Sequence, residues 1–248
     1  MYIRNGEKYM KKFYEKSEIW FAVVWIIVYV VVMGNLRNNF GDGSPVSLIG
    51  LGLIAAVLTV FIVKNKLTQK YGLTSVHDAK RYLFFIPLLL LVSVNLWSGI
   101  SLHYDGMSQI FAVLNMALVG YIEEIVFRGL LFKAIEKNNV KRGIIISAVT
   151  FGAGHIINLL TGQATVDTVL QIVYAIAIGF AFVMVFYRSK SLIPCIVTHS
   201  LIDITSKFSG VTSSAMDYII AVFIIIVAGG YALYLAKQKE NVQPSVPE

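Results

Sequence analysis

The sequence predicts an all-α membrane protein, a polytopic bundle of about eight transmembrane helices with both termini in the cytoplasm. Three observations lead to this fold class. Of the 248 residues, 57% are hydrophobic and only 14% are charged, whereas a soluble domain has about 25% charged residues. Apolar runs long enough to cross a bilayer recur along the chain. Finally, Lys and Arg gather in alternate connections between those runs.

Eight segments are expected to be membrane helices because their apolar runs have the length that a bilayer crossing requires. They are residues 18–34, 46–63, 82–100, 108–132, 143–160, 168–187, 191–207 and 218–236. The first follows a basic N-terminus but is not followed by a small-residue cleavage site, so we read it as a retained helix and not as a signal peptide. The seventh is the least apolar, since it carries His199 and Asp203.

The charges of the connections support all eight spans and set the orientation. The N-terminus and every second connection after it hold eighteen Lys and Arg residues in total, whereas the connections between them hold only two, Arg37 and Lys207. Positively charged loops remain in the cytoplasm. The alternation would be broken without the seventh span, and it places both termini on the cytoplasmic side. The one remaining basic residue, Arg128, lies inside the fourth span.

The chain shows no soluble domain or internal repeat. We divide it into three N-terminal helices (1–100), a core of helices four to seven (101–210), a last helix (211–237) and a disordered tail (238–248).

The net charge of +7 does not indicate nucleic-acid binding, because the basic residues lie between apolar segments and not on one face. The expected partners are lipid and a membrane-associated substrate. A lone cysteine, Cys195, excludes a disulfide within the chain.

Ionisable residues inside the fourth span are the most informative feature. Glu123, Glu124 and Arg128 lie within an otherwise apolar run. An Asp, Lys or Arg at the centre of a membrane helix costs roughly 2.5 to 3.5 kcal/mol on insertion scales. Charged groups kept at such a cost usually face a wet cavity and have a function.

Two further spans carry unusual polar residues at a similar depth. The fifth holds Phe151 and His155, and the seventh holds His199 and Asp203. At 1.5 Å per residue, Glu123, His199 and His155 lie roughly 12 to 18 Å from the cytoplasmic ends of their helices. One site that opens toward the cytoplasm can therefore hold all three.

Helical spacing suggests how these groups pair. Glu124 and Arg128 are four residues apart and can form an ion pair. The carboxylate of Glu123 is then available for catalysis. Asp203 is four residues after His199 and can accept a hydrogen bond from its ring. Four glycines, at 120, 129, 152 and 154, would let helices or a substrate approach closely.

The chemistry that fits these side chains is peptide-bond hydrolysis. A glutamate beside a histidine can deprotonate water, and a second histidine can stabilise the oxyanion. Glu123, His155 and His199 would equally form a zinc site with one open position. The spacing does not decide between these two mechanisms. A polar cavity could also serve an ion-coupled transporter, although the polar residues lie in one half of the chain and transporters commonly show paired repeats.

Three motifs in this order resemble the CPBP family of intramembrane proteases. They are Glu-Glu-x-x-x-Arg at 123–128, Phe-x-x-x-His at 151–155 and His-x-x-x-Asp at 199–203. The family includes the type II CAAX prenyl endopeptidases and the bacterial Abi proteins linked to bacteriocin processing and self-immunity. The eukaryotic prenyl-processing branch typically has Asn where this chain has Asp203. The short chain and loops fit the bacterial branch better.

The resemblance implies a role for each motif residue. Glu123 and His155 would activate water, with or without a divalent metal such as zinc. His199 and Asp203 would form or support the oxyanion site, while Glu124 and Arg128 would position their helix and the water-activating carboxylate. An ionised Asp203 would repel an oxyanion, so it would either be protonated or orient His199.

We therefore expect a multi-pass endopeptidase in a bacterial plasma membrane, reached from the cytoplasmic side. Its substrate would be a membrane-associated peptide or protein, such as a pheromone precursor, a bacteriocin leader or a lipid-modified C-terminus. The alternatives are a non-catalytic membrane protein that acts in immunity or regulation by binding, and the ion-coupled transporter.

Overall fold

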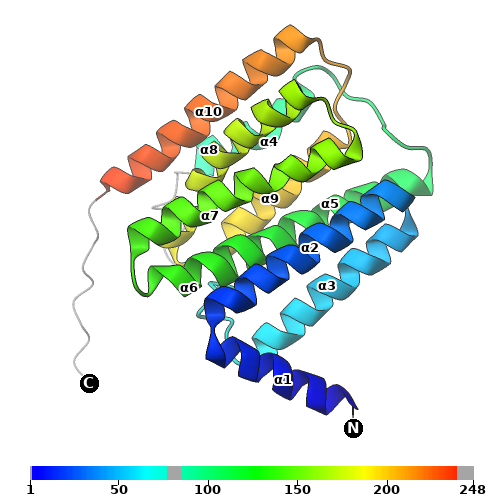
Figure 1. The fold of residues 1–248 in the computed structure, drawn as a ribbon. Coiled ribbons are helices and arrows are strands. Elements are labelled where there is room, and N and C mark those ends of the chain that lie inside the picture. Colours follow the sequence, from blue (N-terminus) through cyan, green and yellow to red (C-terminus); the bar gives the residue numbers. More distant parts are fainter. Residues whose placement is uncertain (1, 77–84, 239–248) are drawn as a thin grey trace.

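The chain folds into a bundle of antiparallel helices in a computed structural model that describes residues 2–76 and 85–238 (Figure 1). Within these ranges the only β pairing is an isolated bridge between Ile100 and Ser209. The helices are α1 (Tyr2–Lys16), α2 (Glu18–Phe40), α3 (Pro45–Lys64), α4 (Ile86–Ser93), η2 (Val94–Leu96), α5 (Met107–Glu123), η3 (Glu124–Phe132), α6 (Lys133–Glu136), α7 (Val140–Gly154), η4 (His155–Thr161), α8 (Thr165–Ser189), α9 (Ile193–Ser206) and α10 (Ser214–Lys237).

Six helices among the described residues are long and apolar enough to cross a membrane. They correspond to the first, second, fourth, fifth, sixth and eighth expected spans. The seventh is a shorter apolar helix, α9, of 14 residues. The third begins outside the described residues and continues as the short helices α4 and η2. The all-helical fold class is confirmed, whereas the count of eight spans is not.

The helix starts follow from local chemistry. Ser17, Ser44, Asn139 and Ser213 stand before α2, α3, α7 and α10, and each accepts a backbone hydrogen bond from the first turn of its helix. Such N-caps satisfy amide groups that the helix itself leaves unpaired. Proline occupies the first turns of α3, α4 and α9, where its missing N–H costs nothing.

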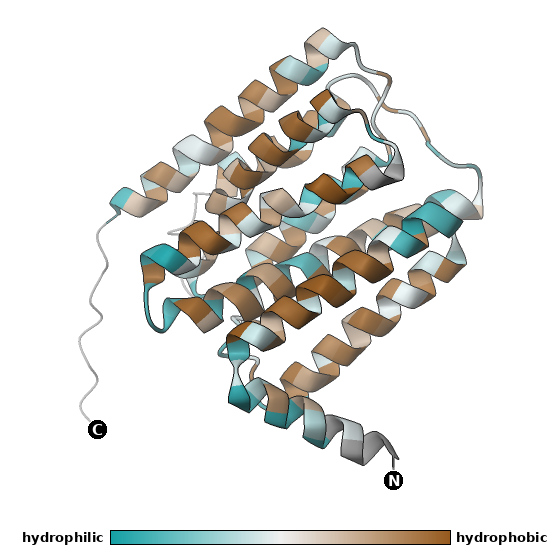
Figure 2. Ribbon diagram, viewed as in Figure 1, coloured by the Kyte–Doolittle hydropathy of each residue, from teal (hydrophilic) through white to brown (hydrophobic). Residues whose placement is uncertain are grey.

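Most of the outward surface is apolar. Figure 2 shows brown, hydrophobic ribbon along the length of the long helices and teal, hydrophilic ribbon mainly near their ends. Large side chains such as Ile27, Leu53, Ile226 and Leu233 are exposed on this surface. A soluble protein rarely exposes so large an apolar area. The pattern is that of a bundle whose outer faces contact lipid.

The two ends of the bundle differ in charge. At one end lie α1, residues 65–76, the turn from α6 to α7, the turn from α8 to α9 and the end of α10, and we call it the basic end. Contacts across it include Glu18 with Lys70 at 2.7 Å and with Lys137 at 2.5 Å, and Leu192 N–H donating to Gly72 O at 2.7 Å.

The opposite end holds residues 41–44, 97–106, 162–164 and 207–213. Asp42 joins its elements by pairing with Arg37 at 3.1 Å and with Lys207 at 2.6 Å. Burial raises the pKa of the Asp42 carboxyl, but the two cations outweigh this effect and hold that pKa below its usual value.

Candidate active site

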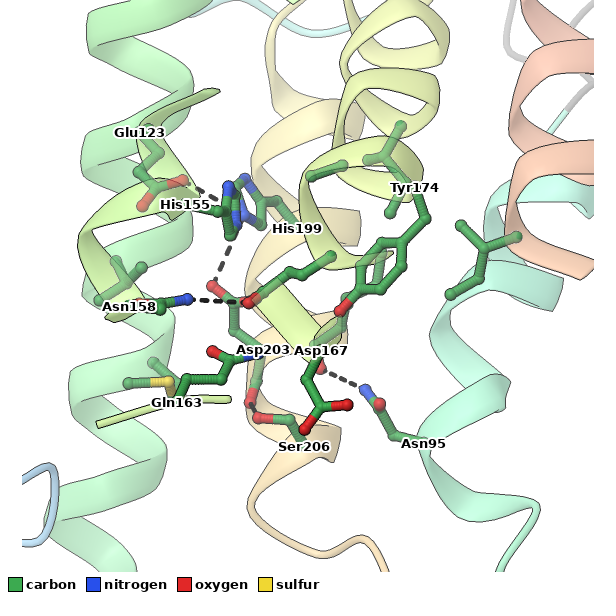
Figure 3. Close-up of a pocket in the computed structure, with 18 of the residues that line it drawn as sticks. Asn95, Glu123, His155, Asn158, Gln163, Asp167, Tyr174, His199, Asp203 and Ser206 are labelled. Atoms are coloured by element: carbon green, nitrogen blue, oxygen red, sulfur yellow. Dashed lines mark hydrogen bonds and ion pairs between the residues drawn. The ribbon is translucent and has the colours of Figure 1, made fainter. Parts of the chain in front are cut away.

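The structure brings the three motifs together. Glu123, His155, His199 and Asp203 all line one cavity of about 520 Å³. They come from α5, the junction of α7 with η4, and α9. Figure 3 shows the first three at one end of this cavity, with Gln163, Asp167 and Ser206 toward its other end. The cluster expected from helix depth is therefore present.

Glu123 is held by a residue that lies outside the three motifs. The Tyr29 hydroxyl, from α2, donates to Oε1 of Glu123 at 2.6 Å. The other carboxylate oxygen lies 3.7 Å from Nε2 of His199. One oxygen is thus fixed by a hydrogen bond while the other faces the imidazole, at a separation that a water molecule beside them can bridge. Glu123 remains partly exposed to the cavity.

Glu124 and Arg128 form the expected ion pair, at 2.7 Å, and both side chains are fully buried. Glu124 begins η3 and Arg128 lies at its middle, in a segment of π-helix whose nine residues are all buried. The Arg128 guanidinium also lies 4.0 Å from the centre of the Phe151 ring, a favourable cation–π contact. Wide helical turns of this kind occur frequently at functional sites. No sequence pattern indicated the π-helix.

The partner that orients His199 is Glu124, which corrects the expectation for Asp203. Nδ1 of His199 lies 2.8 Å from Oε1 of Glu124. Asp203 instead approaches the other ring nitrogen, Nε2, at 3.6 Å, which is too long for a hydrogen bond. The i, i+4 spacing places Asp203 beside the ring, but Nδ1 faces the helix that carries Glu124. Nε2 therefore points into the cavity between Glu123 and Asp203.

Phe151 contacts both imidazoles. Its ring centre lies 5.5 Å from that of His155 and 5.4 Å from that of His199, in edge-to-face arrangements. His155 is the point at which α7 tightens into the 3₁₀ helix η4, and its Nδ1 lies 3.3 Å from the Phe151 carbonyl oxygen. If Nδ1 carries the proton, it donates to this carbonyl, and Nε2 is then the ring nitrogen left for chemistry.

Further polar residues line the cavity beyond those expected from the sequence. They include Tyr29, Asn95, Asn158, Gln171 and Tyr174. Asn158 donates to the Gln171 side chain at 2.8 Å, which joins η4 to α8. A signal was available for Tyr29, since tyrosines of membrane helices gather at the interfaces. A tyrosine in the middle of a span needs a buried partner for its hydroxyl.

The cavity extends toward the opposite end of the bundle and not toward the basic end. Its lining among the described residues reaches exposed Asp167 and Asp217, at the starts of α8 and α10. Toward the basic end the lining reaches Phe127, which is buried, and Arg128 and Phe182 are buried as well. If the basic end is the cytoplasmic one, as the charge alternation predicts, the cavity extends away from the side of access that the sequence led us to expect. Helix depth locates a residue along the bundle but does not show toward which end the cavity extends.

No group of three His, Cys, Asp or Glu side chains in the described part of the chain is arranged to hold a metal ion. Within the zinc set expected from the sequence, the contact between Glu123 and Nε2 of His199 is the one seen, at 3.7 Å. Among the described residues, Glu123 and His199 therefore form a carboxylate–imidazole pair, and His155 lies beside this pair.

Comparison with known proteins agrees with the site. Residues 106–205 match the family model described as type II CAAX prenyl endopeptidase, Rce1-like. No curated protein matches the chain. The matched segment begins one residue before α5 and ends within α9, so it holds all three motifs. The match of this segment supports the CPBP family, the family of the CAAX proteases.

Proposed function

We propose that the protein is an intramembrane endopeptidase that hydrolyses a peptide bond of a membrane-associated peptide or protein. The observation that supports this most strongly is the convergence of Glu123, His155 and His199 on one cavity inside the bundle. The family match supports the same reaction class, because the matched family is one of proteases. The proposed location is the plasma membrane of a bacterium.

Glu123 is the proposed general base. A water molecule between its free carboxylate oxygen and the histidines would give a proton to Glu123 as its oxygen attacks the carbonyl carbon of the substrate. The tetrahedral intermediate then breaks the C–N bond, and the proton on Glu123 passes to the leaving amine. Tyr29 would hold the carboxylate in place by bonding its other oxygen. His155 would help to position the water.

His199 is the proposed oxyanion donor. With Nδ1 against Glu124 at 2.8 Å, a protonated ring would donate from Nε2 to the negative oxygen of the intermediate. Glu124 and Arg128 would act through His199 and are positioning residues. Asp203 lies beside the same nitrogen, where it would stabilise the imidazolium form.

The first test is cleavage of candidate peptides by the purified protein and its variants. Glu123→Gln, His155→Ala and His199→Ala should each lower kcat by about 10²- to 10⁴-fold, the usual contribution of a general acid or base. Glu15→Gln is the matched control, because Glu15 lies on α1 and is exposed. Cleavage that survives in the Glu123 and His155 variants would overturn the proposal. A cellular phenotype that survives in folded, inactive variants would instead indicate a binding protein.

A second measurement separates the two hydrolytic mechanisms. If a zinc ion takes part, Glu123, His155 and His199 would have to move together to hold it, and it would polarise the carbonyl or the water. One equivalent of zinc in the purified protein, with turnover that a chelator abolishes, would support metal catalysis. Full activity of a metal-free preparation would support water activation by glutamate alone.

A further inference from the structure

The cavity lining is buried toward one end of the bundle and exposed toward the other. On the side of the basic end it reaches Phe127, which is buried, as are Arg128 and Phe182. From there the lining continues past His199 and Asp203 to Gln163, Thr212 and exposed Asp217, at the opposite end of the bundle. A substrate that reaches Glu123 through this cavity must therefore enter from the end that is poor in Lys and Arg.

The charges identify the basic end as the cytoplasmic one. Among the Lys and Arg residues that the structure describes, fifteen lie in or beside the segments of that end and two lie at the other. Basic loops stay in the cytoplasm. Those two, Arg37 and Lys207, both pair with Asp42.

Helix α1 supports the same orientation. It lies at the basic end and carries several lysines, of which Lys11 is exposed. Its Tyr14 is buried and packs edge-on against Phe21 and Phe61, at 5.3 and 5.4 Å. An amphipathic basic helix of this kind is attracted to the anionic lipids of the cytoplasmic leaflet.

We propose that the active site opens on the extracytoplasmic side, so that the substrate is an exported, membrane-associated peptide whose scissile bond enters from the outer face. This rests on the proposed function. The enzyme would cleave its substrate after, or during, transfer of that segment across the membrane. A peptide confined to the cytoplasm would not reach Glu123.

The first experiment measures which end is outside. Cys195 is buried and is the only cysteine, so Cys195→Ala provides a background for two single-cysteine variants. Val211→Cys lies in the exposed loop at the opposite end, and Asn138→Cys lies in the exposed turn at the basic end. In intact bacterial cells a membrane-impermeant maleimide should label position 211 at once and position 138 only after permeabilisation. The reverse pattern would overturn the proposal.

The second experiment measures access to the site itself. A membrane-impermeant peptide that the purified enzyme cleaves in detergent is added to sealed right-side-out vesicles and to inverted vesicles. We expect cleavage in the right-side-out vesicles, and in the inverted ones only after detergent is added. Cleavage confined to sealed inverted vesicles would refute outer access while leaving the protease assignment intact. If no candidate peptide is cleaved even in detergent, the proposed function fails instead.

Discussion

At the scale of single residues, the site is built around buried charges that neutralise one another. Glu124 accepts from both Arg128 at 2.7 Å and His199 at 2.8 Å, through the same oxygen. The second oxygen of Glu124 and two nitrogens of Arg128 have no hydrogen-bond partner among the described residues. Such groups are costly to bury. We interpret this cost as the consequence of fixing His199 rigidly inside a helix bundle.

Tyr29 offers a test of how Glu123 is positioned. Tyr29→Phe removes the 2.6 Å hydrogen bond to Glu123 but keeps the ring. A hydrogen bond to a charged group contributes about 1.5 to 3 kcal/mol, so kcat should fall roughly tenfold or more with little change in KM. Tyr121→Phe is the matched control, because its hydroxyl bonds Thr59 at 2.7 Å outside the cavity. Equal kcat values for the two variants would argue against a positioning role for Tyr29.

At the scale of elements, close helix packing sets the geometry of the site. A Cβ atom on Gly120 would lie 2.5 Å from the backbone nitrogen of Ser200, next to His199. Only glycine permits this approach of α5 to α9. Gly152 likewise meets the backbone of α8, because a Cβ atom there would lie 2.8 Å from the backbone nitrogen of Ile176.

Gly120→Ala should therefore separate α5 from α9 and displace His199 from Glu124. Overpacking costs about 1 to 3 kcal/mol, so we expect a lower melting temperature in detergent together with reduced cleavage. Gly229→Ala, in α10, has nothing within 4 Å of its new Cβ and should leave both unchanged or raise stability slightly. If Gly120→Ala behaves like this control, the close approach is not needed.

The elements also show how far sequence reasoning reaches. Hydropathy located the six long apolar helices of the described residues, because the length of an apolar run relates directly to the thickness of a bilayer. It did not indicate α1, which is short and basic. Spacing predicted the Glu124–Arg128 pair, a local contact. It did not predict the π-helix after Glu123 or the short length of α9. Nor did it predict that Gly129 and Gly154 have room for a side chain, since a Cβ atom on either would meet nothing closer than 3.8 Å. Those features depend on what packs opposite, which no local pattern contains.

At the scale of the whole molecule, each end is held by one acidic residue that joins distant segments. Glu18 contacts Lys70 and Lys137 at the basic end. Asp42 contacts Arg37 and Lys207 at the opposite end, and its backbone carbonyl accepts from Asn115 at 2.6 Å. The charge alternation that separates the two ends was readable from the sequence. The direction in which the cavity extends was not, since it depends on which side chains of different helices pack around it.

Asp42 should make the stability of the fold depend on pH. Its folded-state pKa is lowered, because Arg37 and Lys207 outweigh the effect of burial. A lowered pKa means that the stabilisation is fully present above the unfolded pKa, near 3.9, and is lost as the pH falls through the folded value. At neutral pH, Asp42→Asn should therefore lower the stability by roughly 1 to 3 kcal/mol. Melting temperatures of wild type and variant, measured in detergent from neutral pH down to about pH 3, should converge in acid.

Asp105→Asn, an exposed carboxylate at the same end, is the control and should differ little from wild type at any pH. A gap between wild type and Asp42→Asn that stays constant into acid would show that the ion pairs do not hold this end together.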